Sequence, residues 1–557
     1  MIDYRTPVED ILFTLRHGAE VERLPQWDDS IASEIIGQAA RLIDAEIAPL
    51  DPELDATPAR LVDGRVRLHP AIAAAYAKYR DAGWSGLSMP EEFGGQGQPH
   101  VFAAVISEML SGASINFQIQ IALAQGAART IASHGTDEQK ATYLPRLASG
   151  EILATMCLTE PQAGSDLSLV RTTATQADDG TWRINGGKIF ITGADQDLTD
   201  DIVHLVLART PDAPPGVKGL ALFTCPAVLP DGRRNGVSVV RIEEKMGLHS
   251  SPTCQVAFDG AVAEIMGGRG EGLARMFTMM NFARLDVAMQ GVGLTEVAGQ
   301  RSRAYAIQRR QGRAGRGDGP DAIVRHDDVR RMLMTQMALA GGCRAMAYRA
   351  LVELELGERP AWVEFMTPVC KAVATEGAME AGNLAVQVHG GYGFLREYRV
   401  EQIVRDGRIT AIYEGTNGIQ SMTLASRLLR LDNGACAAAF ADDAAQVAAA
   451  ARADGRTAMA DRLDQALADW RQAGERIAAM TNPGLVATSF MRLTGLVALG
   501  AAWSRLEAAA DHSPRPDRTR AVATFVRDWM LPETRHLADR IAGGAEVTGL
   551  ADTLFED

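Results

Sequence analysis

The sequence contains few cysteines, and none of them belongs to a recognisable motif. The six cysteines are scattered along 557 residues without a C-x-x-C pair. This spacing matches neither a zinc site nor a disulfide framework, so we expect reduced thiols, no metal and a cytoplasmic protein. The first residues, MIDYRTPVEDILFTL, lack a basic segment followed by an apolar one. We therefore expect no secretory signal.

Positive charge and long apolar runs are also scarce. The formal net charge is −14 at pH 7, which argues against nucleic acid or an anionic membrane as a partner. The most apolar stretch, Gly484–Trp503, contains Arg492 near its middle. It is therefore expected to be a buried helix of a bundle, not a membrane span. A chain of 557 residues is too long for one simple core, so several domains are expected.

The apolar pattern is helical at first and then changes. Apolar residues recur every three or four positions in Ile31–Ile47, Pro70–Asp81 and Phe102–Leu123, which predicts helices. Thr136 is an expected N-cap. From about Thr155, short β-branched segments separated by turn signals predict a compact antiparallel β domain. Its expected strands are Gly187–Thr192, Ile202–Ala208, Leu220–Cys225, Val237–Ile242 and Thr253–Phe258.

From about Leu273 the pattern is helical again. Residues 309–320, RRQGRAGRGDGP, interrupt it with four arginines, which suit either a solvated loop or an anion contact. The final region has thirteen Arg, no Lys and eighteen acidic residues, too acidic for a DNA-binding tail. The expected domains are an N-terminal helical domain (1–154), a middle β domain (155–268), a C-terminal helical bundle (269–430) and a helical extension (431–557).

One carboxylate has an unusual setting. Glu414 follows the apolar residues Ala411–Tyr413 and precedes the sequence GTNG, where a helix is expected to end. Burial among apolar side chains would raise the pKa of this carboxyl towards working pH, as a proton-abstracting base requires. From spacing alone, a surface glutamate at a helix C-terminus is the more ordinary interpretation.

The residues around Glu414 resemble a known family. Residues 387–420 contain Q-x-x-G-G-x-G-F, E-Y, R-D and I-Y-E-G-T in order, which resembles the C-terminal signature of the acyl-CoA dehydrogenases. MCLTEPQAGSD at Met156–Asp166 resembles that family's T-E-P-x-A-G-S-D segment. The resemblance covers about residues 2–430. It implies a mainly α fold with an inserted β domain: a helical N-domain, a β-barrel middle domain, a four-helix-bundle C-domain and here a helical extension.

The resemblance implies an activity. Family members use FAD to convert an acyl-CoA thioester to the trans-2-enoyl-CoA: the Glu of Y-E-G-T removes the α-proton and flavin N5 accepts the β-hydride. Glu414 is therefore the expected base, because Ala283 stands where some relatives carry theirs. EEKMGLHSSPTC, FTMMNFARL and the extension are most like the 3-methylmercaptopropionyl-CoA dehydrogenase group of large bacterial members. That likeness favours 3-methylthiopropionyl-CoA or another short or medium acyl-CoA.

The resemblance also implies binding residues and partners. The expected FAD-binding residues are Leu158, Thr159, Gly164, Ser165, Phe190, Thr192, Arg309, Gln311, Gln387, Gly390, Gly391, Thr416 and Gly418. The expected acyl-CoA-binding residues are Ser165, Asn281, Arg284, Tyr413 and Gly415. The (i, i+3) spacing of Asn281 and Arg284 predicts one helix face. An electron-transfer flavoprotein is the expected acceptor, and the expected assembly is a homodimer or homotetramer.

Two departures from the family pattern are visible. Phe190 stands where relatives usually carry Trp, and Gly312-Arg313 replaces an aromatic-Gly pair after Arg309. In relatives the element around this Arg reaches the FAD pyrophosphate of a neighbouring subunit, and here Arg313 or Arg316 are alternative cations. Two other functions stay open: an acyl-CoA oxidase or flavin monooxygenase on the same fold, and a non-catalytic flavin-binding relative. The acidic extension counts against the latter.

Overall fold

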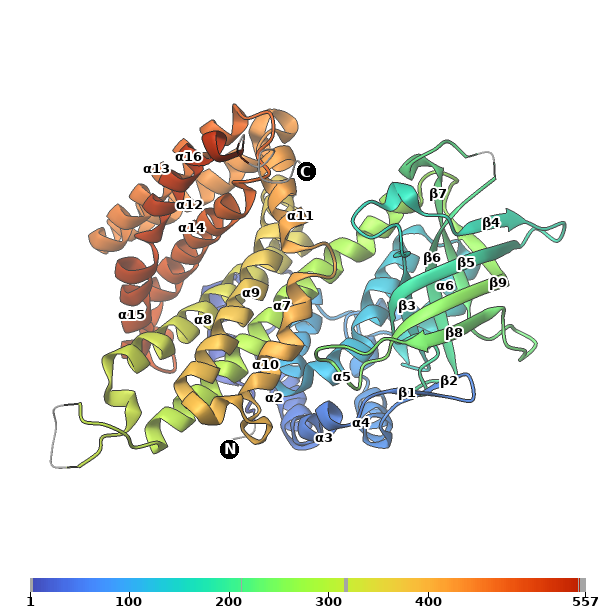
Figure 1. The fold of residues 1–557 in the computed structure, drawn as a ribbon, viewed down its shortest axis with the longest axis horizontal. Coiled ribbons are helices and arrows are strands. Elements are labelled where there is room, and N and C mark those ends of the chain that lie inside the picture. The colour runs from blue at the N-terminus through green and yellow to red at the C-terminus, as the bar shows by residue number, and fades with distance from the viewer. Residues whose placement is uncertain (1–3, 212, 315–318, 549, 551–557) are drawn as a thin grey trace. The chain divides into compact units, whose positions relative to one another are not determined.

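A computed structural model describes residues 4–211, 213–314, 319–548 and 550 (Figure 1). Its contacts divide the chain into two compact units. The first unit comprises Met1–Ala40, Ala104–Gly112 and Val287–Asp557, and the second comprises Arg41–Ala103 and Ala113–Asp286. Helices α2 (Asp29–Leu42), α5 (His100–His134) and α7 (Gly272–Gln308) contribute residues to both.

The described strands belong to the second unit, together with α3 (Asp51–Ala56), α4 (Pro70–Asp81) and α6 (Asp137–Ala148). The strands are β1 (Arg60–Val62), β2 (Arg65–Arg67), β3 (Ile152–Cys157), β4 (Thr173–Gln176), β5 (Trp182–Thr192), β6 (Asp201–Arg209), β7 (Leu220–Pro226), β8 (Val237–Ile242) and β9 (Thr253–Met266). The first two form a hairpin, and the other seven form one sheet (Figure 1).

The pairings of the larger sheet close a ring. β6 pairs with β4, β4 with β5, β5 with β9, β9 with β7, and β7 returns to β6. The expected β-barrel is therefore confirmed. The expectation of an antiparallel domain is wrong for β3 and β4, which both pair with β6 in parallel. The chain between β3 and β6 is long enough for the crossover that parallel pairing requires.

Most expected elements are present, but strands β1 to β4 were not expected. All five expected strands occur, with β5 and β9 longer than predicted. Thr136 caps α6 in a reciprocal capping box with Gln139. The β1–β2 hairpin was not expected. Its turn, Asp63-Gly64, has φ of 50° and 73°, which is the geometry that favours Asp-Gly in tight hairpins. The strands are too short for the apolar alternation that would have indicated them.

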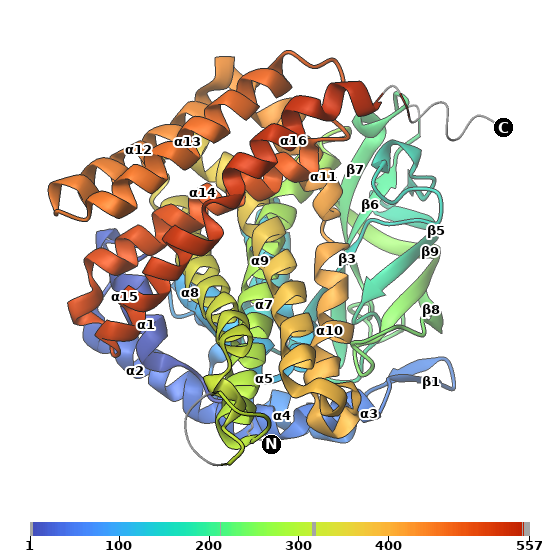
Figure 2. The same ribbon diagram turned by 60° about the vertical axis from the view of Figure 1, so that its left-hand side comes forward.

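The first unit is helical. Besides its share of α2, α5 and α7 it contains α1 (Val8–His17), α8 (Asp327–Leu356), α9 (Pro360–His389), α10 (Val400–Gly407), α11 (Asn417–Met422), α12 (Ala435–Ala453), α13 (Thr457–Ala478), α14 (Ala487–Ala508), α15 (Pro516–Phe525) and α16 (Glu533–Thr548). Figure 2 shows α8, α9 and α10 side by side, with α12, α13, α14 and α16 as a second group.

The apolar stretch that prompted the membrane question lies mostly in α14. Its Arg492 pairs with Glu533 at 2.6 Å, and most of the side chains of α14 are buried. Across the described ranges, no helix combines the length and hydropathy needed to cross a bilayer.

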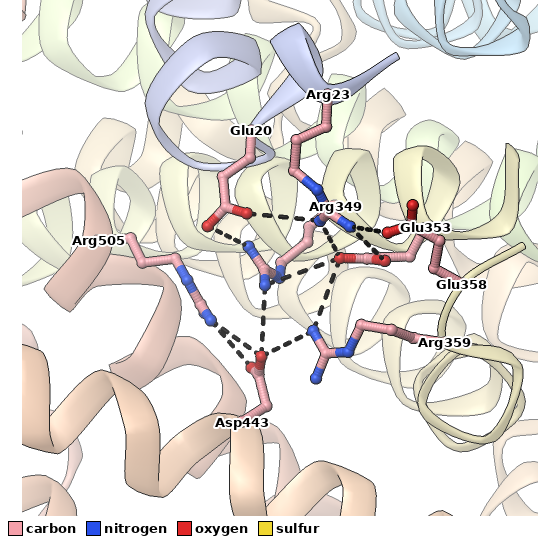
Figure 3. Close-up of polar contacts among 8 residues, drawn as sticks. All are labelled: Glu20, Arg23, Arg349, Glu353, Glu358, Arg359, Asp443 and Arg505. Carbon is pink, nitrogen blue, oxygen red and sulfur yellow. Dashed lines mark hydrogen bonds and ion pairs between the residues drawn. The ribbon is translucent and has the colours of Figure 1, made fainter. Parts of the chain in front are cut away.

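An ion-pair network attaches the extension to the rest of the first unit (Figure 3). Its members are Glu20, Arg23, Arg349, Glu353, Glu358, Arg359, Asp443 and Arg505. Asp443 on α12 contacts Arg349 at 3.3 Å, Arg359 at 3.0 Å and Arg505 at 3.0 Å. Burial raises the pKa of Asp443, but the neighbouring arginines outweigh it and hold the pKa below its ordinary value. The four positive and four negative groups balance, so the network is neutral.

Candidate active site

The loop that matches T-E-P-x-A-G-S-D follows β3 in the second unit. The backbone N–H of Ile189 donates to the Thr159 carbonyl at 2.9 Å, and Lys188 Nζ donates to the Leu158 carbonyl at 2.9 Å. Both bonds attach the loop to β5. Gly164 and Ser165 are exposed, and a Cβ added to Gly164 would meet no atom within 4 Å. The loop therefore presents polar groups beside open space.

Glu160 fixes this loop from within the protein. Its Oε1 accepts from Lys188 Nζ at 2.8 Å and from the Thr172 N–H at 3.0 Å, and its Oε2 accepts from the Arg171 N–H at 2.7 Å. Glu160 is 3% exposed and Lys188 is 0% exposed. Burial raises the pKa of Glu160, but Lys188 and the hydrogen bonds outweigh it and lower the pKa to about 2.

Phe190 has an unusual position in β5. Its φ is 60°, in the left-handed region that bulky residues seldom adopt, and its side chain is 59% exposed. The β5–β9 register shifts between Lys188 and Ile191, and such bulges redirect side chains. Thr192 returns to regular pairing, opposite Thr253. The result is an exposed aromatic ring on the strand to which the loop is bonded.

The residues expected to contact CoA lie together on α7. Arg284 Nη1 donates to Asn281 Oδ1 at 3.0 Å, so the two side chains share one face as expected. The guanidinium carbon of Arg284 lies 5.9 Å from the centre of the Phe277 ring. Ala283, between them in sequence, offers only a methyl group and no proton-accepting atom.

In the first unit, Glu414 has a strained backbone. Its φ is 53°, and that of Gly415 is 84°, so a left-handed non-glycine residue precedes a left-handed glycine. Gln420 Nε2 donates to the Glu414 carbonyl at 3.2 Å, and Lys371 Nζ donates to the Gly415 carbonyl at 3.0 Å. Two side chains therefore hold the peptide groups that orient the half-buried Glu414.

The surrounding contacts extend this support. Lys371, on α9 and 0% exposed, also donates to Asn417 Oδ1 at 2.8 Å. The Tyr413 hydroxyl donates to Gln290 Oε1, and the Thr416 hydroxyl caps α11 by accepting from the Ile419 N–H at 3.1 Å. Tyr413, Gly415 and Thr416 are among the residues expected from the sequence, whereas Lys371 and Gln290 were not expected.

Four of the residues expected to contact FAD, Arg309, Gln387, Gly390 and Gly391, lie near the end of α9. The guanidinium carbon of Arg309 is 5.6 Å from the centre of the Tyr392 ring. Gly390, with φ of 60°, and Gly391 have no atom within 4 Å of an added Cβ. The Gln387 carbonyl accepts from the Gly390 N–H at the end of α9. The exposed Arg309 and the open backbone of Gly390 and Gly391 therefore lie near the same end of α9.

Two other residues expected to contact FAD, Gln311 and Gly418, lie elsewhere in the first unit. The backbone N–H of Gln311 donates to the Asp321 carbonyl at 2.9 Å, and Gln311 is exposed. Gly418, at the start of α11, is also exposed. Arg313 is exposed, and Arg316 lies outside the described residues.

The fold and these loops define a class of protein. Four family models match the chain: "Acyl-CoA dehydrogenase, N-terminal domain" at residues 32–151, the corresponding "middle domain" at 155–261, the "C-terminal domain" at 270–429, and "Acetyl-CoA dehydrogenase C-terminal like" at 438–550. The chain belongs to the acyl-CoA dehydrogenase family, whose members are FAD-dependent oxidoreductases acting on acyl-CoA.

Individual relatives sharpen this placement. The 3-methylmercaptopropionyl-CoA dehydrogenase of Ruegeria pomeroyi is 41% identical over 534 residues, covering 89% of this chain and 90% of that protein. The broad-specificity linear acyl-CoA dehydrogenase FadE5 of Mycobacterium tuberculosis is 34% identical, covering 78% and 76%. The structure of Caenorhabditis elegans ACDH-11 in complex with C11-CoA shares the fold over 98% of this chain and 95% of its own, with a TM-score of 0.82 at 19% identity.

Proposed function

We propose that this enzyme oxidises an acyl-CoA thioester to the trans-2-enoyl-CoA, with Glu414 removing the α-proton. The observation that carries the proposal is the backbone of Glu414 and Gly415, which is left-handed and bonded by Gln420 and Lys371. Strain of this kind is maintained where a side chain must be aimed. A carboxylate held in this way serves as a general base when its target proton lies within hydrogen-bond reach.

The chemistry requires more than the base. Loss of the α-proton places negative charge on the thioester oxygen, and fixed hydrogen-bond donors stabilise that charge as it develops. FAD, when bound, supplies flavin N5 as the acceptor for the hydride that leaves the β-carbon. Glu414 keeps the α-proton, so the products balance as enoyl-CoA, protonated Glu414 and reduced flavin.

The residues present fit FAD. The exposed ring of Phe190 suits the flat flavin ring. The loop residues Leu158, Thr159, Gly164 and Ser165 offer backbone and hydroxyl donors without net charge, and Thr192 lies on the same strand as Phe190. In the first unit, the proposed FAD contacts are Arg309, Gln311, Gln387, Gly390, Gly391, Thr416 and Gly418.

For the substrate, we assign the CoA end to Ser165, Asn281 and Arg284, and the acyl end to Tyr413 and Gly415. A guanidinium suits phosphate and an amide suits an adenine edge. The similarity to the Ruegeria pomeroyi enzyme supports 3-methylthiopropionyl-CoA or another short or medium acyl-CoA.

We further propose a cytoplasmic homodimer or homotetramer that passes electrons to an electron-transfer flavoprotein. An oligomer is supported by exposed apolar side chains near Arg309: Ile307 is 56% exposed, Tyr392 41%, Phe394 84% and Leu395 45%. All six cysteines are free and buried, which suits a reducing compartment. The domain boundaries given above remain our proposal for how the chain is organised.

The test is Glu414→Gln with acyl-CoA added anaerobically. The variant should retain FAD and bind acyl-CoA, yet bleach the flavin at least about 10²-fold more slowly, since an amide cannot accept the proton. Gln occupies nearly the same volume as Glu, so lost FAD would indicate a structural effect instead. Bleaching at the parental rate would exclude Glu414 as the base. Stoichiometric peroxide from the parental enzyme in air would favour the oxidase alternative.

A further inference from the structure

The first unit contains a cavity of ≈ 430 Å³ to which the proposed reaction assigns no role. The start of α1, the middle of α7, α8 and the extension line it, and none of the residues proposed to contact FAD or acyl-CoA does. Its volume lies within the range of about 300–1,000 Å³ typical of small-molecule sites.

The lining carries more positive than negative charge. Five arginines (Arg5, Arg303, Arg344, Arg515 and Arg518) face three acids (Glu9, Asp10 and Glu296). Arg344 pairs with Glu296 at 3.0 Å and also with Glu108, and Arg515 contacts Asp10 at 3.4 Å. Glu108 does not line the cavity but pairs with Arg344, so it reduces the local excess of positive charge from two to one.

Two of the lining arginines, Arg303 and Arg518, are unpaired within the part of the chain that the structure describes. Neither forms a hydrogen bond or ion pair with any residue in the described ranges, and Nη1 of Arg518 is buried without a partner. Burial lowers the pKa of Arg518; the charges of Asp10 and Glu296 raise it, and those of Arg303 and Arg515 lower it. Arg518 is half-buried, whereas Arg303 and Arg515 are exposed at the rim. An anion between Arg303 and Arg518 would relieve their mutual repulsion.

The local backbone and the apolar part of the lining specify the ligand further. The ten-residue α15 begins at Pro516 beside the cavity and has no side-chain cap, so its first-turn N–H groups favour an anion. The larger apolar side chains of the lining are Phe13, Met337, Trp503, Leu506 and Val522. A ligand that matches both parts has a charged head and an apolar or aromatic body.

We propose that this cavity binds a phosphate monoester of about mononucleotide size, with its phosphate at Arg303 and Arg518 and its body against Trp503. A phosphate monoester carries about −1.5 to −2 at neutral pH and has enough acceptor oxygens to contact both Arg303 and Arg518, whereas a monocarboxylate has one charge and two oxygens. Arginine also binds phosphate oxygens through two parallel hydrogen bonds. The site uses residues of the first unit alone and is independent of the proposed function.

The test is calorimetric titration of the FAD-loaded enzyme with AMP, adenosine and inorganic phosphate, repeated with the acyl-CoA site saturated. AMP should bind with one equivalent per chain whether or not acyl-CoA is present, and adenosine should bind at least about tenfold more weakly because it lacks the charged contact. Arg518→Gln should weaken AMP at least about tenfold by the same loss. Arg520→Gln removes a neighbouring exposed arginine that pairs with Asp511 and does not line the cavity, and it should bind AMP normally.

Arg303→Gln keeps the proposal testable if Arg518→Gln fails to fold, because Arg303 is exposed and unbonded. It should also weaken AMP. Arg284→Ala should leave AMP binding unchanged. The proposal is overturned if neither AMP nor phosphate binds, if Arg303→Gln and Arg518→Gln bind AMP like the parent, or if Arg284→Ala and acyl-CoA abolish binding, which would place AMP at the CoA site.

Discussion

The loop after β3 and the segment around Glu414 are each held by a buried lysine, but the two lysines differ in what they bind. Lys188 donates to the Leu158 carbonyl and pairs with the Glu160 carboxylate. Lys371 donates to the Gly415 carbonyl and to the amide oxygen of Asn417. Both side chains are 0% exposed, in a chain with only six lysines.

Because of this difference, we expect loss of Lys188 to affect mainly the stability of the fold and loss of Lys371 to affect mainly the rate of turnover. Removing Lys188 would leave Glu160 as a buried charge that has lost its partner, which is costly wherever it occurs. Lys371 donates to two neutral oxygens in the segment that orients Glu414, the Gly415 carbonyl and the Asn417 amide oxygen. Loss of these two hydrogen bonds should therefore change the geometry of Glu414 more than it changes the stability of the fold.

The largest expected effect is that of Lys188→Met. It should lower the free energy of unfolding by about 3–5 kcal/mol, because one partner of a buried ion pair is removed. Denaturant unfolding followed by circular dichroism would measure it, with FAD content as a second readout. Adding Glu160→Gln should recover part of the loss by removing the orphaned charge. A loss below about 1 kcal/mol would show that the pair is not buried in solution.

Lys371→Met should act mainly on turnover. We expect kcat to fall about 10²-fold, as for small displacements of a catalytic group, with KM for acyl-CoA changed little. The variant should keep its FAD and its visible spectrum, which distinguishes misplacement of Glu414 from loss of the cofactor. If KM rises while kcat is unchanged, Lys371 supports substrate binding instead of the base.

These two lysines also show where sequence reasoning stops. Apolar periodicity predicted strands β5 to β9, and ordered motifs predicted the candidate loops, because both signals lie in contiguous residues. Lys371 lies 43 positions before Glu414 in the sequence, and its contact with the Gly415 carbonyl exists only once α9 is folded against that segment. The strained φ of Glu414 is equally invisible, since the segment resembles any helix end that contains glycine.

Lys188 could have been found from the sequence. It lies inside a segment expected to be a strand, next to Ile189 and Phe190. A lysine in such a place either faces solvent or needs an acid, and Glu160 is an acid in the neighbouring motif. The alternation of apolar and polar residues could not show whether Lys188 faces solvent or pairs with an acid, because the bulge at Phe190 changes which side chains point inward.

A smaller effect should appear in the acid range, and only for the loop held by Lys188. The pKa of Glu160 is lowered from its ordinary 4.5 to about 2 in the folded protein. Because the folded value lies below the unfolded one, Glu160 stabilises the fold fully above about pH 4.5, and this contribution is lost as the pH falls towards about 2. Unfolding measured from pH 6 to pH 3 should therefore show a shallower decline for Glu160→Gln than for the parent. Parallel curves would contradict the assigned shift.

The smallest expected effect tests whether burial, and not contact distance, sets the importance of Lys188. Lys78 pairs with Glu46 at 2.5 Å, closer than Lys188 and Glu160 at 2.8 Å, but its side chain is 54% exposed and that of Glu46 is 39% exposed. Water solvates both groups when the pair breaks, so Lys78→Met should change the free energy of unfolding by less than about 1 kcal/mol. Both pairs belong to the second unit, and the substitution is the same, so one series of denaturant curves compares them directly. If Lys78→Met proves as destabilising as Lys188→Met, contact distance would be the governing variable, and the distinction between a buried anchor and a surface pair would fail.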